Sequence, residues 1–139
     1  RIKNKNLIKI KAIDNITKIF LPSSVTSIGN SAFFSCSNLI EVHCGGTTNI
    51  GNAAFSFSGI KTIYMPSVTT IGNMAFKRCD SLISINIPNT VTNIGAETFD
   101  GCHNLENVHL PLGLTEIPYS MFNFCTRLDS IVWPAQLTT

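Results

Sequence analysis

The chain has 139 residues, which is enough for one ordinary domain. Hydrophobic residues make up 44% of it and charged residues 13%, against a typical charged share of about 25%, so the chain can bury a core and is not a disordered segment. The net charge of +2 is too small to indicate a nucleic-acid partner, and no apolar run approaches the ~20 residues of a membrane span, so no direct membrane insertion is expected.

One unit recurs along the chain. It reads L-x-x-I-x-I-P, then a short link, then V-T-x-I-G-x-x-A-F-x-x-C-x-x-L, and its phenylalanines are Phe33, Phe55, Phe76, Phe99 and Phe122. The period of about 22 residues lies in the range of leucine-rich repeats. A unit of this size cannot bury its own apolar face, so the units must stack on one another.

The units follow in chain order. Residues 1–15 fit least well and are a degenerate repeat or an edge strand, because IKIKAI at 8–13 alternates as a strand does. Further units lie near 16–39, 40–60, 61–82, 83–105 and 106–128, with a partial unit at 129–139. The unit at 40–60 is shorter than the others, and we therefore expect a looser coil at 45–60. The expectation is a single domain over 1–139 that forms part of a longer array.

Each part of the unit has its own predicted structure. The I-x-I part alternates with period two and predicts a short strand, which the following proline ends. The apolar residues of A-F-x-x-C-x-x-L lie three apart and predict a turn or two of helix, which Asn30, Asn52 and Asn73 could cap. A glycine follows the isoleucine of V-T-x-I in most units, and Pro118 replaces it in one. Because proline fixes φ at a negative value, the position does not require positive φ, and small size at a bend is the better explanation. The predicted fold class is α/β, a leucine-rich-repeat solenoid with a parallel sheet of short strands on the concave side and short helices or turns on the other.

The stretch IPNTVTNIGAETFDGCHNLENVHLP, at 87–111, resembles the BspA-type leucine-rich repeat, which occurs in surface proteins of anaerobic bacteria and parasitic protists. The resemblance extends over residues 16 to 139. It implies a location at the cell surface or in the secreted fraction. It also implies protein partners, since some members bind matrix or plasma glycoproteins such as fibronectin and fibrinogen. The family carries no catalytic motif.

The cysteines Cys36, Cys79, Cys102 and Cys125 share one repeat position, so they are expected to form an inward-facing ladder. Buried thiols acting as core filler are the main interpretation. Disulfides between neighbours stay an alternative, because adjacent units lie ~4.8 Å apart. A zinc site is disfavoured because no C-x-x-C pair exists. We expect neither a metal nor a cofactor.

Catalysis is not expected either. His43 and His109 lie between the paired apolar residues of their strands and are predicted to point outward, three units apart. Regular stacking cannot bring a nucleophile, a base and an orienting acid from such positions within hydrogen-bond reach. The sequence therefore predicts no catalytic residues, and the chain is not predicted to be an enzyme.

Two columns of outward-facing residues predict a binding surface on the concave face. The first is Phe20, His43, Tyr64, Asn86, His109 and Val132, and the second is Lys18, Glu41, Thr62, Ser84, Asn107 and Ser130. Aromatic and adaptable polar side chains suit a protein interface. The predicted function is a non-catalytic binding module for adhesion to host or neighbouring-cell glycoproteins.

Two other functions stay open. One is a structural spacer or a stalk that associates end to end through its unpaired edge strands. The other is a glycan-binding surface formed by Phe20, Tyr64 and Trp133. It is disfavoured because Trp133 fills a core strand position and is expected to be buried.

Overall fold

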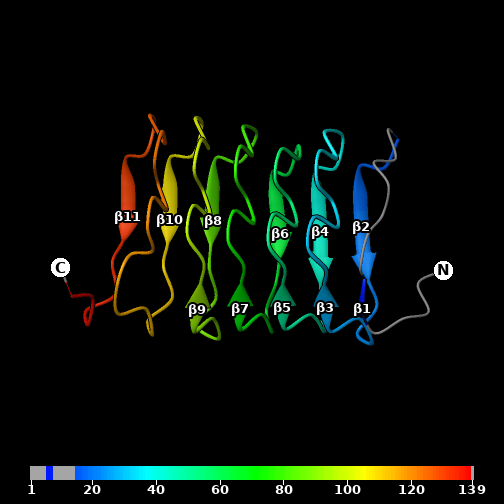
Figure 1. Cartoon of the computed structure of the whole chain (residues 1–139), viewed down its shortest axis with the longest axis horizontal. Coiled ribbons are helices and arrows are strands. Elements are labelled where there is room, and N and C mark those ends of the chain that lie inside the picture. Colours follow the sequence, from blue (N-terminus) through cyan, green and yellow to red (C-terminus); the bar gives the residue numbers. More distant parts are fainter. Residues whose placement is uncertain (1–5, 8–14, 139) are drawn as a thin grey trace.

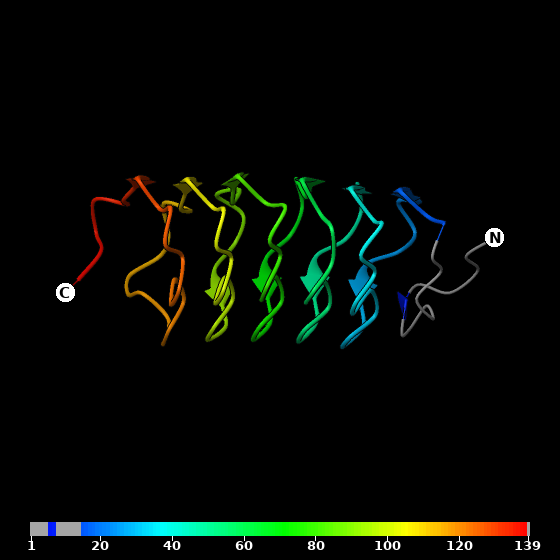
Figure 2. The same cartoon turned by 90° about the horizontal axis from the view of Figure 1, so that it is seen from above.

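The computed structural model describes residues 6–7 and 15–138, and the strand expected at 8–13 lies outside these residues. The described residues wind into successive coils that stack along one axis, so that residues near 18 lie toward one end of the stack and residues near 130 toward the other (Figure 1). Turned by 90°, the coils follow one another in a single row (Figure 2). The predicted solenoid of parallel strands is confirmed.

Each coil contributes one longer strand to the same side of the solenoid. These strands are β2 (Lys18–Leu21), β4 (Glu41–Cys44), β6 (Thr62–Tyr64), β8 (Ser84–Asn86), β10 (Asn107–His109) and β11 (Ser130–Val132). They pair in parallel as two three-stranded sheets, β2-β4-β6 and β8-β10-β11. They coincide with the I-x-I segments, because an inward-facing apolar residue lies at the centre of each.

A second row of strands was not predicted. It consists of β1 (Asn6–Leu7), β3 (Ser27–Ile28), β5 (Asn49–Ile50), β7 (Thr70–Ile71) and β9 (Asn93–Ile94), which form a five-stranded parallel sheet in that order. Each strand has two residues, so it shows at most one inward-facing side chain. Sequence periodicity needs a longer run to indicate a strand.

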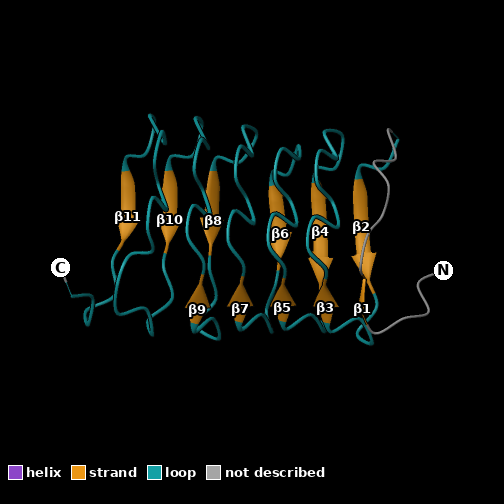
Figure 3. Ribbon diagram, viewed as in Figure 1, coloured by secondary structure: helices purple, strands orange, loops and turns teal. Residues whose placement is uncertain are grey.

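The described residues contain no helix (Figure 3), so the short helices predicted on the other side are wrong. In the segment 31–35, alternate backbone N–H groups donate to the next coil, as Phe33 does to the carbonyl of Ala54 at 2.7 Å. Between them, the N–H of Phe34 donates to the carbonyl of Ser31 at 3.2 Å. A helix keeps its N–H bonds within its own segment. The same alternation recurs at 53–57, 74–78 and 97–101.

Backbone angles also exclude a helix here. Ser31 and Ser35 have φ values of 57° and 59°, in the left-handed region, and the corresponding residues of the later coils also have positive φ. A right-handed helix has φ near −63° throughout. The three-residue spacing of apolar positions therefore arises from a turn bonded to its neighbours. We call this part of the solenoid, 31–35, 53–57, 74–78, 97–101 and 120–124, the turn side.

Asn30, Asn52 and Asn73 do not cap helices. The side-chain oxygen of each accepts a hydrogen bond from a backbone N–H in the next coil, namely that of Asn52 at 2.8 Å, Asn73 at 2.9 Å and Ala96 at 2.9 Å. The three side chains thus form a ladder along the solenoid. Each supplies one coil-to-coil contact at the bend that follows β3, β5 or β7.

This asparagine ladder explains the repeated glycine. A Cβ atom on Gly72 would lie 2.6 Å from the side-chain oxygen of Asn52, and one on Gly95 would lie 2.4 Å from that of Asn73. The expected requirement for small size is therefore confirmed. Pro118 holds the same place in a coil whose predecessor carries Ala96 instead of asparagine, so no amide occupies the space.

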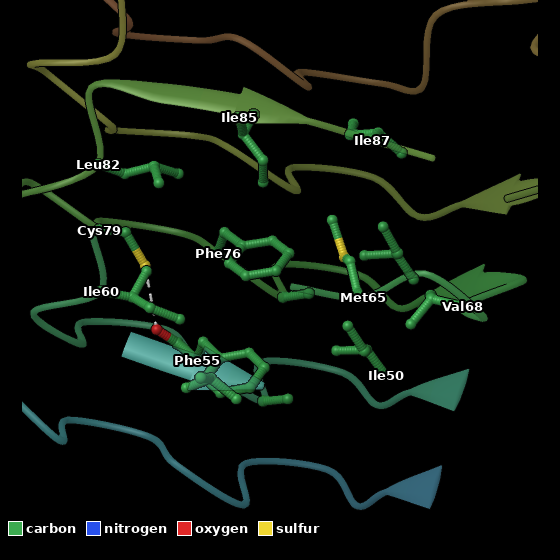
Figure 4. Packing of buried hydrophobic residues seen from close by; sticks show 14 of the residues in the cluster. Ile50, Phe55, Ile60, Met65, Val68, Phe76, Cys79, Leu82, Ile85 and Ile87 are labelled. Carbon is green, nitrogen blue, oxygen red and sulfur yellow. Dashed lines mark hydrogen bonds between the residues drawn. The ribbon is translucent and has the colours of Figure 1, made fainter. Parts of the chain in front are cut away.

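The repeated phenylalanines form the centre of the core. Their rings stack nearly parallel, with neighbouring centroids 5.2–5.9 Å apart and interplanar angles of 6–10°, along Phe33, Phe55, Phe76, Phe99 and Phe122. Figure 4 shows Phe55 and Phe76 among buried aliphatic side chains. The first four rings are at most 1% exposed.

The looser coil expected at 45–60 is not found. Its strand β5 pairs with both β3 and β7, and its turn segment keeps the bonds to the next coil. Two glycines accommodate the missing residues. A Cβ atom on Gly46 would lie 2.0 Å from the carbonyl oxygen of Ser23, and one on Gly59 would lie 2.1 Å from that of Ser37. The shortened chain is therefore pressed against the preceding coil.

The cysteines are thiols without disulfide bonds, as expected. Four are buried and Cys125 is partly exposed. In three consecutive coils the thiol donates to the carbonyl of the phenylalanine one coil back. Cys79 donates to Phe55 at 3.1 Å, Cys102 to Phe76 at 3.0 Å and Cys125 to Phe99 at 3.1 Å. The thiols thus fill the core and also connect the coils.

Burial of the thiols predicts a loss of stability at alkaline pH. Burial raises the pKa of Cys79 from 9.0 to about 12, and it does the same for Cys44. Above pH 9 the unfolded chain gains free energy by ionising these thiols, whereas the folded protein keeps them protonated until about pH 12. The free energy of unfolding should therefore fall over this window. Urea denaturation at increasing pH measures it. The variant Cys79→Ala should show a shallower fall, and an unchanged slope would contradict the assignment.

Candidate binding surface

The outward side of β2, β4, β6, β8, β10 and β11 is called the strand face below. All twelve residues of the two predicted columns lie on these strands, and none of them is buried. In the register of the sheets, Phe20 lies beside His43 and His43 beside Tyr64, whereas Asn86, His109 and Val132 adjoin one another on the other three strands. The two columns thus form two adjacent rows along the solenoid.

Three rings of the first column form an exposed stack. His43 lies between Phe20 and Tyr64, with ring centroids 4.4 Å and 4.3 Å apart and interplanar angles of 17° and 24°. Phe20 is 66% exposed and Tyr64 is 51% exposed. Large aromatic rings that stay exposed but are held in place by stacking present a preorganised apolar surface to a partner.

A charged cluster supports this stack. Nε2 of His43 lies 2.6 Å from Oε1 of Glu41, and Nζ of Lys18 lies 3.3 Å from its Oε2. The hydrogen bond with His43 lowers the pKa of the Glu41 carboxyl, partial burial opposes this effect, and Lys18 lowers the pKa further. The carboxylate therefore holds the imidazole ring in its place between the two neighbouring rings.

The variant His43→Phe tests this contact, because it keeps a ring in the stack and removes the hydrogen bond. The pKa of Glu41 should rise toward its ordinary value of 4.5. An NMR titration of the side-chain carboxyl carbon measures the shift. The control Phe20→Leu changes the ring on the other side of His43 and should leave the pKa of Glu41 low. An unchanged pKa in His43→Phe would show that Lys18 dominates instead.

The two columns on the other half of the strand face contain no aspartate, glutamate, lysine or arginine. Ser84, Asn107 and Ser130 are exposed on β8, β10 and β11, and Val132 is 52% exposed. His109 is partly buried, and its Nδ1 atom has no hydrogen-bond partner within the described part of the chain. This mixture of polar and apolar side chains suits a partner that buries both kinds of group together.

A groove lies where the two halves meet. The described residues show no pairing between β6 and β8, and Figure 1 shows these strands farther apart than their neighbours. The groove has a volume of about 560 Å³, and its walls include Tyr64, Met65, Ile85 and Asn86. Sequence reasoning placed Tyr64 and Asn86 in one column but gave no indication that the sheet is interrupted between them.

Trp133 was expected to be buried, and this is wrong, because it is 52% exposed. Met65, Ile87 and Leu110 hold the same repeat position and are at most 3% exposed, since a following coil covers each of them. Only a short turn follows Trp133 in the described chain, so its ring borders a second pocket with Ile117 and Leu137.

The turn side differs in character from the strand face. Lys77 pairs with Glu97 at 2.7 Å and with Asp100 at 2.9 Å, and these carboxylates raise the pKa of the amine. Just beyond the turn side, Asp80 lies 3.0 Å from Nδ1 of His103. These contacts join the coil that contains Phe76 to the coil that contains Phe99.

The described part of the chain contains neither a metal centre nor a helix that could span a membrane. Across residues 6–7 and 15–138, no three histidine, cysteine, aspartate or glutamate side chains gather closely enough to hold a metal ion. The same residues include no helix with the length and apolarity needed to cross a bilayer.

Comparison with known proteins gives the family. The model of the BspA type leucine-rich repeat region matches in six copies, over residues 9–82 and 48–139. A search of curated proteins finds no significant match.

Three solved structures are similar to this chain. A leucine-rich cell surface protein of Faecalibacterium prausnitzii A2-165 is 32% identical with a TM-score of 0.86, covering 91% of this chain and 34% of that one. A leucine-rich repeat protein of Bacteroides ovatus ATCC 8483 is 31% identical with a TM-score of 0.69, covering 91% and 40%. The pneumococcal vaccine antigen PcpA, 21% identical with a TM-score of 0.78, covers 98% and 33% and shows the fold alone.

The chain thus spans between a third and two fifths of the length of these proteins. The two matched ranges together cover residues 9–139, which is well over half of the chain. The chain therefore belongs to the BspA-type leucine-rich repeat family.

Proposed function

We propose that this chain is a non-catalytic protein-binding module of a cell-surface or secreted protein, and that it binds through the strand face. The observation that carries the proposal is the exposed stack of Phe20, His43 and Tyr64. These three rings stack on one another and stay exposed, and only a partner could bury them further.

Two comparisons support the location and the class of partner. The family model is a leucine-rich repeat, an architecture whose repeated strands present an extended binding surface. One similar structure, at 32% identity, is that of a cell surface protein. The proposed partners are extracellular matrix or plasma glycoproteins, with fibronectin and fibrinogen as the first to be tested.

The size of the strand face sets the expected affinity. Six strands ~4.8 Å apart span roughly 29 Å, and the exposed strand residues span roughly 13 Å, which gives about 380 Å². A standard interface buries about 800 Å² on each partner, so this chain alone should bind weakly, with micromolar or higher Kd. The assay must therefore measure weak binding directly.

The test is binding of the purified chain to immobilised fibronectin and fibrinogen, measured by surface plasmon resonance. We expect saturable binding, which the double variant Tyr64→Ala/His109→Ala weakens by about tenfold or more, since aromatic anchors carry much of an interface's energy. The matched control is Phe124→Ala on the turn side, where the ring is 66% exposed. This control should bind as the unchanged chain does.

The opposite pattern, with binding lost in Phe124→Ala and kept in the double variant, would place the interface on the turn side. Absence of binding to both proteins and to a glycan array would favour the structural spacer. A spacer that associates end to end predicts a concentration-dependent mass in sedimentation, which substitutions on the strand face leave unchanged.

A further inference from the structure

Two backbone hydrogen bonds that neighbouring coils make are missing at the groove between β6 and β8. At the start of β6, the N–H groups of Lys61 and Thr62 both donate to the carbonyl of Ile40, at 2.8 Å and 3.1 Å. Ile83 and Ser84 hold the same positions one coil later, yet neither donates to the carbonyl of Lys61. The corresponding bonds are present again in the next coil, where the N–H groups of Glu106 and Asn107 both donate to the carbonyl of Ile83. The interruption is therefore local.

The aromatic stack ends at this groove. His43 covers one face of the Tyr64 ring, with centroids 4.3 Å apart. The next residue of the column is Asn86, which has no ring, and both Tyr64 and Asn86 line the groove. No ring of the described residues therefore stacks on the second face of Tyr64, which is 51% exposed, and a fourth ring would continue the stack at this position.

The lining suits one apolar ring with a polar edge. Met65, Pro66, Ile85 and Pro88 supply apolar contacts, and the polar lining side chains are those of Lys61, Thr62, Ser84 and Asn86. The volume of about 560 Å³ lies within the range of about 300–1,000 Å³ typical of small-ligand sites. A pyranose would bring hydroxyls around its whole ring, and those set against the prolines and the methionine would lose their hydrogen bonds with water.

We propose that this groove receives an aromatic side chain of the partner protein, tyrosine above all, stacked on the second face of Tyr64. The ring would extend the stack of Phe20, His43 and Tyr64, and its hydroxyl would bond to polar groups of Ser84 or Asn86. Such an anchor in a preformed pocket is the usual centre of a protein interface. The inference rests on the proposed function of the strand face, and it names the chemistry of the partner at that site.

The test uses N-acetyl-L-tyrosinamide as the probe and the methyl groups of Met65 and Ile85 as NMR reporters. Titration of the full chain should give saturable shifts at both methyls and contacts from the probe ring to Tyr64. N-acetyl-L-leucinamide should bind about three- to tenfold more weakly, because it lacks the stacking contribution of a ring. Equal binding of the two amides, or unsaturable shifts at millimolar concentrations, would overturn the proposal.

Two variants make the test specific. Asn86→Phe places a ring of the chain itself beside Tyr64 and should abolish the shifts caused by the probe. Asn123→Phe makes the same change at an exposed position of the turn side, and it should leave binding unchanged. Unchanged methyl shifts of Ile50 and Ile71 would show that both variants fold. Retained probe binding in a folded Asn86→Phe variant would contradict the assigned site.

Methyl β-D-glucopyranoside tests whether the groove binds a sugar instead of an aromatic side chain. Tighter binding of this sugar than of the tyrosine probe, at the same methyls, would replace the aromatic anchor by a saccharide. The probe experiment needs no partner protein, so its failure differs from failure of the proposed function. Lost probe binding with intact binding to fibronectin or fibrinogen would overturn only the anchor.

Discussion

Substitution of Phe76 by alanine is expected to lower the free energy of unfolding by about 3–5 kcal/mol. Phe76 is fully buried and stacks against Phe55 on one side and Phe99 on the other, with centroids 5.5 Å and 5.6 Å apart. Removal of its ring leaves a cavity that the neighbouring coils cannot close, because coil-to-coil hydrogen bonds at 74–78 fix the backbone on both sides.

Phe124→Ala is the matched control for this experiment. Its ring is 66% exposed, so its loss should change the free energy of unfolding by about 0.5 kcal/mol or less. Urea denaturation followed by circular dichroism measures both variants. Similar destabilisation by both substitutions would show that the phenylalanine column is not the centre of the core.

The adjacent glycines Gly45 and Gly46 should respond very differently to alanine. Gly46→Ala should lower the free energy of unfolding by about 2–3 kcal/mol or more, because the new methyl would lie 2.0 Å from the backbone oxygen of Ser23. Backbone atoms cannot move aside as a flexible side chain can, so the coil at 45–60 must shift as a whole. A Cβ atom on Gly45 meets no atom within 4 Å, so Gly45→Ala should be neutral or stabilise by up to about 1 kcal/mol.

Thermal unfolding of the two glycine variants provides the comparison. The expected result is a large decrease in Tm for Gly46→Ala beside an unchanged or slightly higher Tm for Gly45→Ala. Equal Tm values would mean that the second coil is loose enough to admit the methyl group, as the sequence alone suggested.

The repeat predicted most of the architecture. Its spacing placed the strands of the strand face and the phenylalanine column, because each depends on apolar residues recurring at one place in every coil. The turn side could not be predicted in the same way. A three-residue apolar spacing fits a helix and a turn equally well, and the alternation between local bonds and bonds to the next coil leaves no signal in the side chains.

The candidate surface was predicted less completely. Alternation along the strands identified the exposed residues, including Tyr64 and Asn86. It could not show that β6 and β8 are unpaired, since the sequence of this coil resembles that of its neighbours. Trp133 was misplaced for another reason, because burial at its repeat position depends on the coil that follows and not on the strand itself.

Side-chain footprinting tests the central claim, binding through the strand face, most directly. Hydroxyl-radical oxidation, read by mass spectrometry, reports on exposed rings of both sides. Phe20 and Tyr64 represent the strand face, and Phe57 and Phe124 represent the turn side. With fibronectin or fibrinogen bound, whichever binds, oxidation of Phe20 and Tyr64 should fall while that of Phe57 and Phe124 stays unchanged. Protection confined to Phe57 and Phe124 would contradict the account.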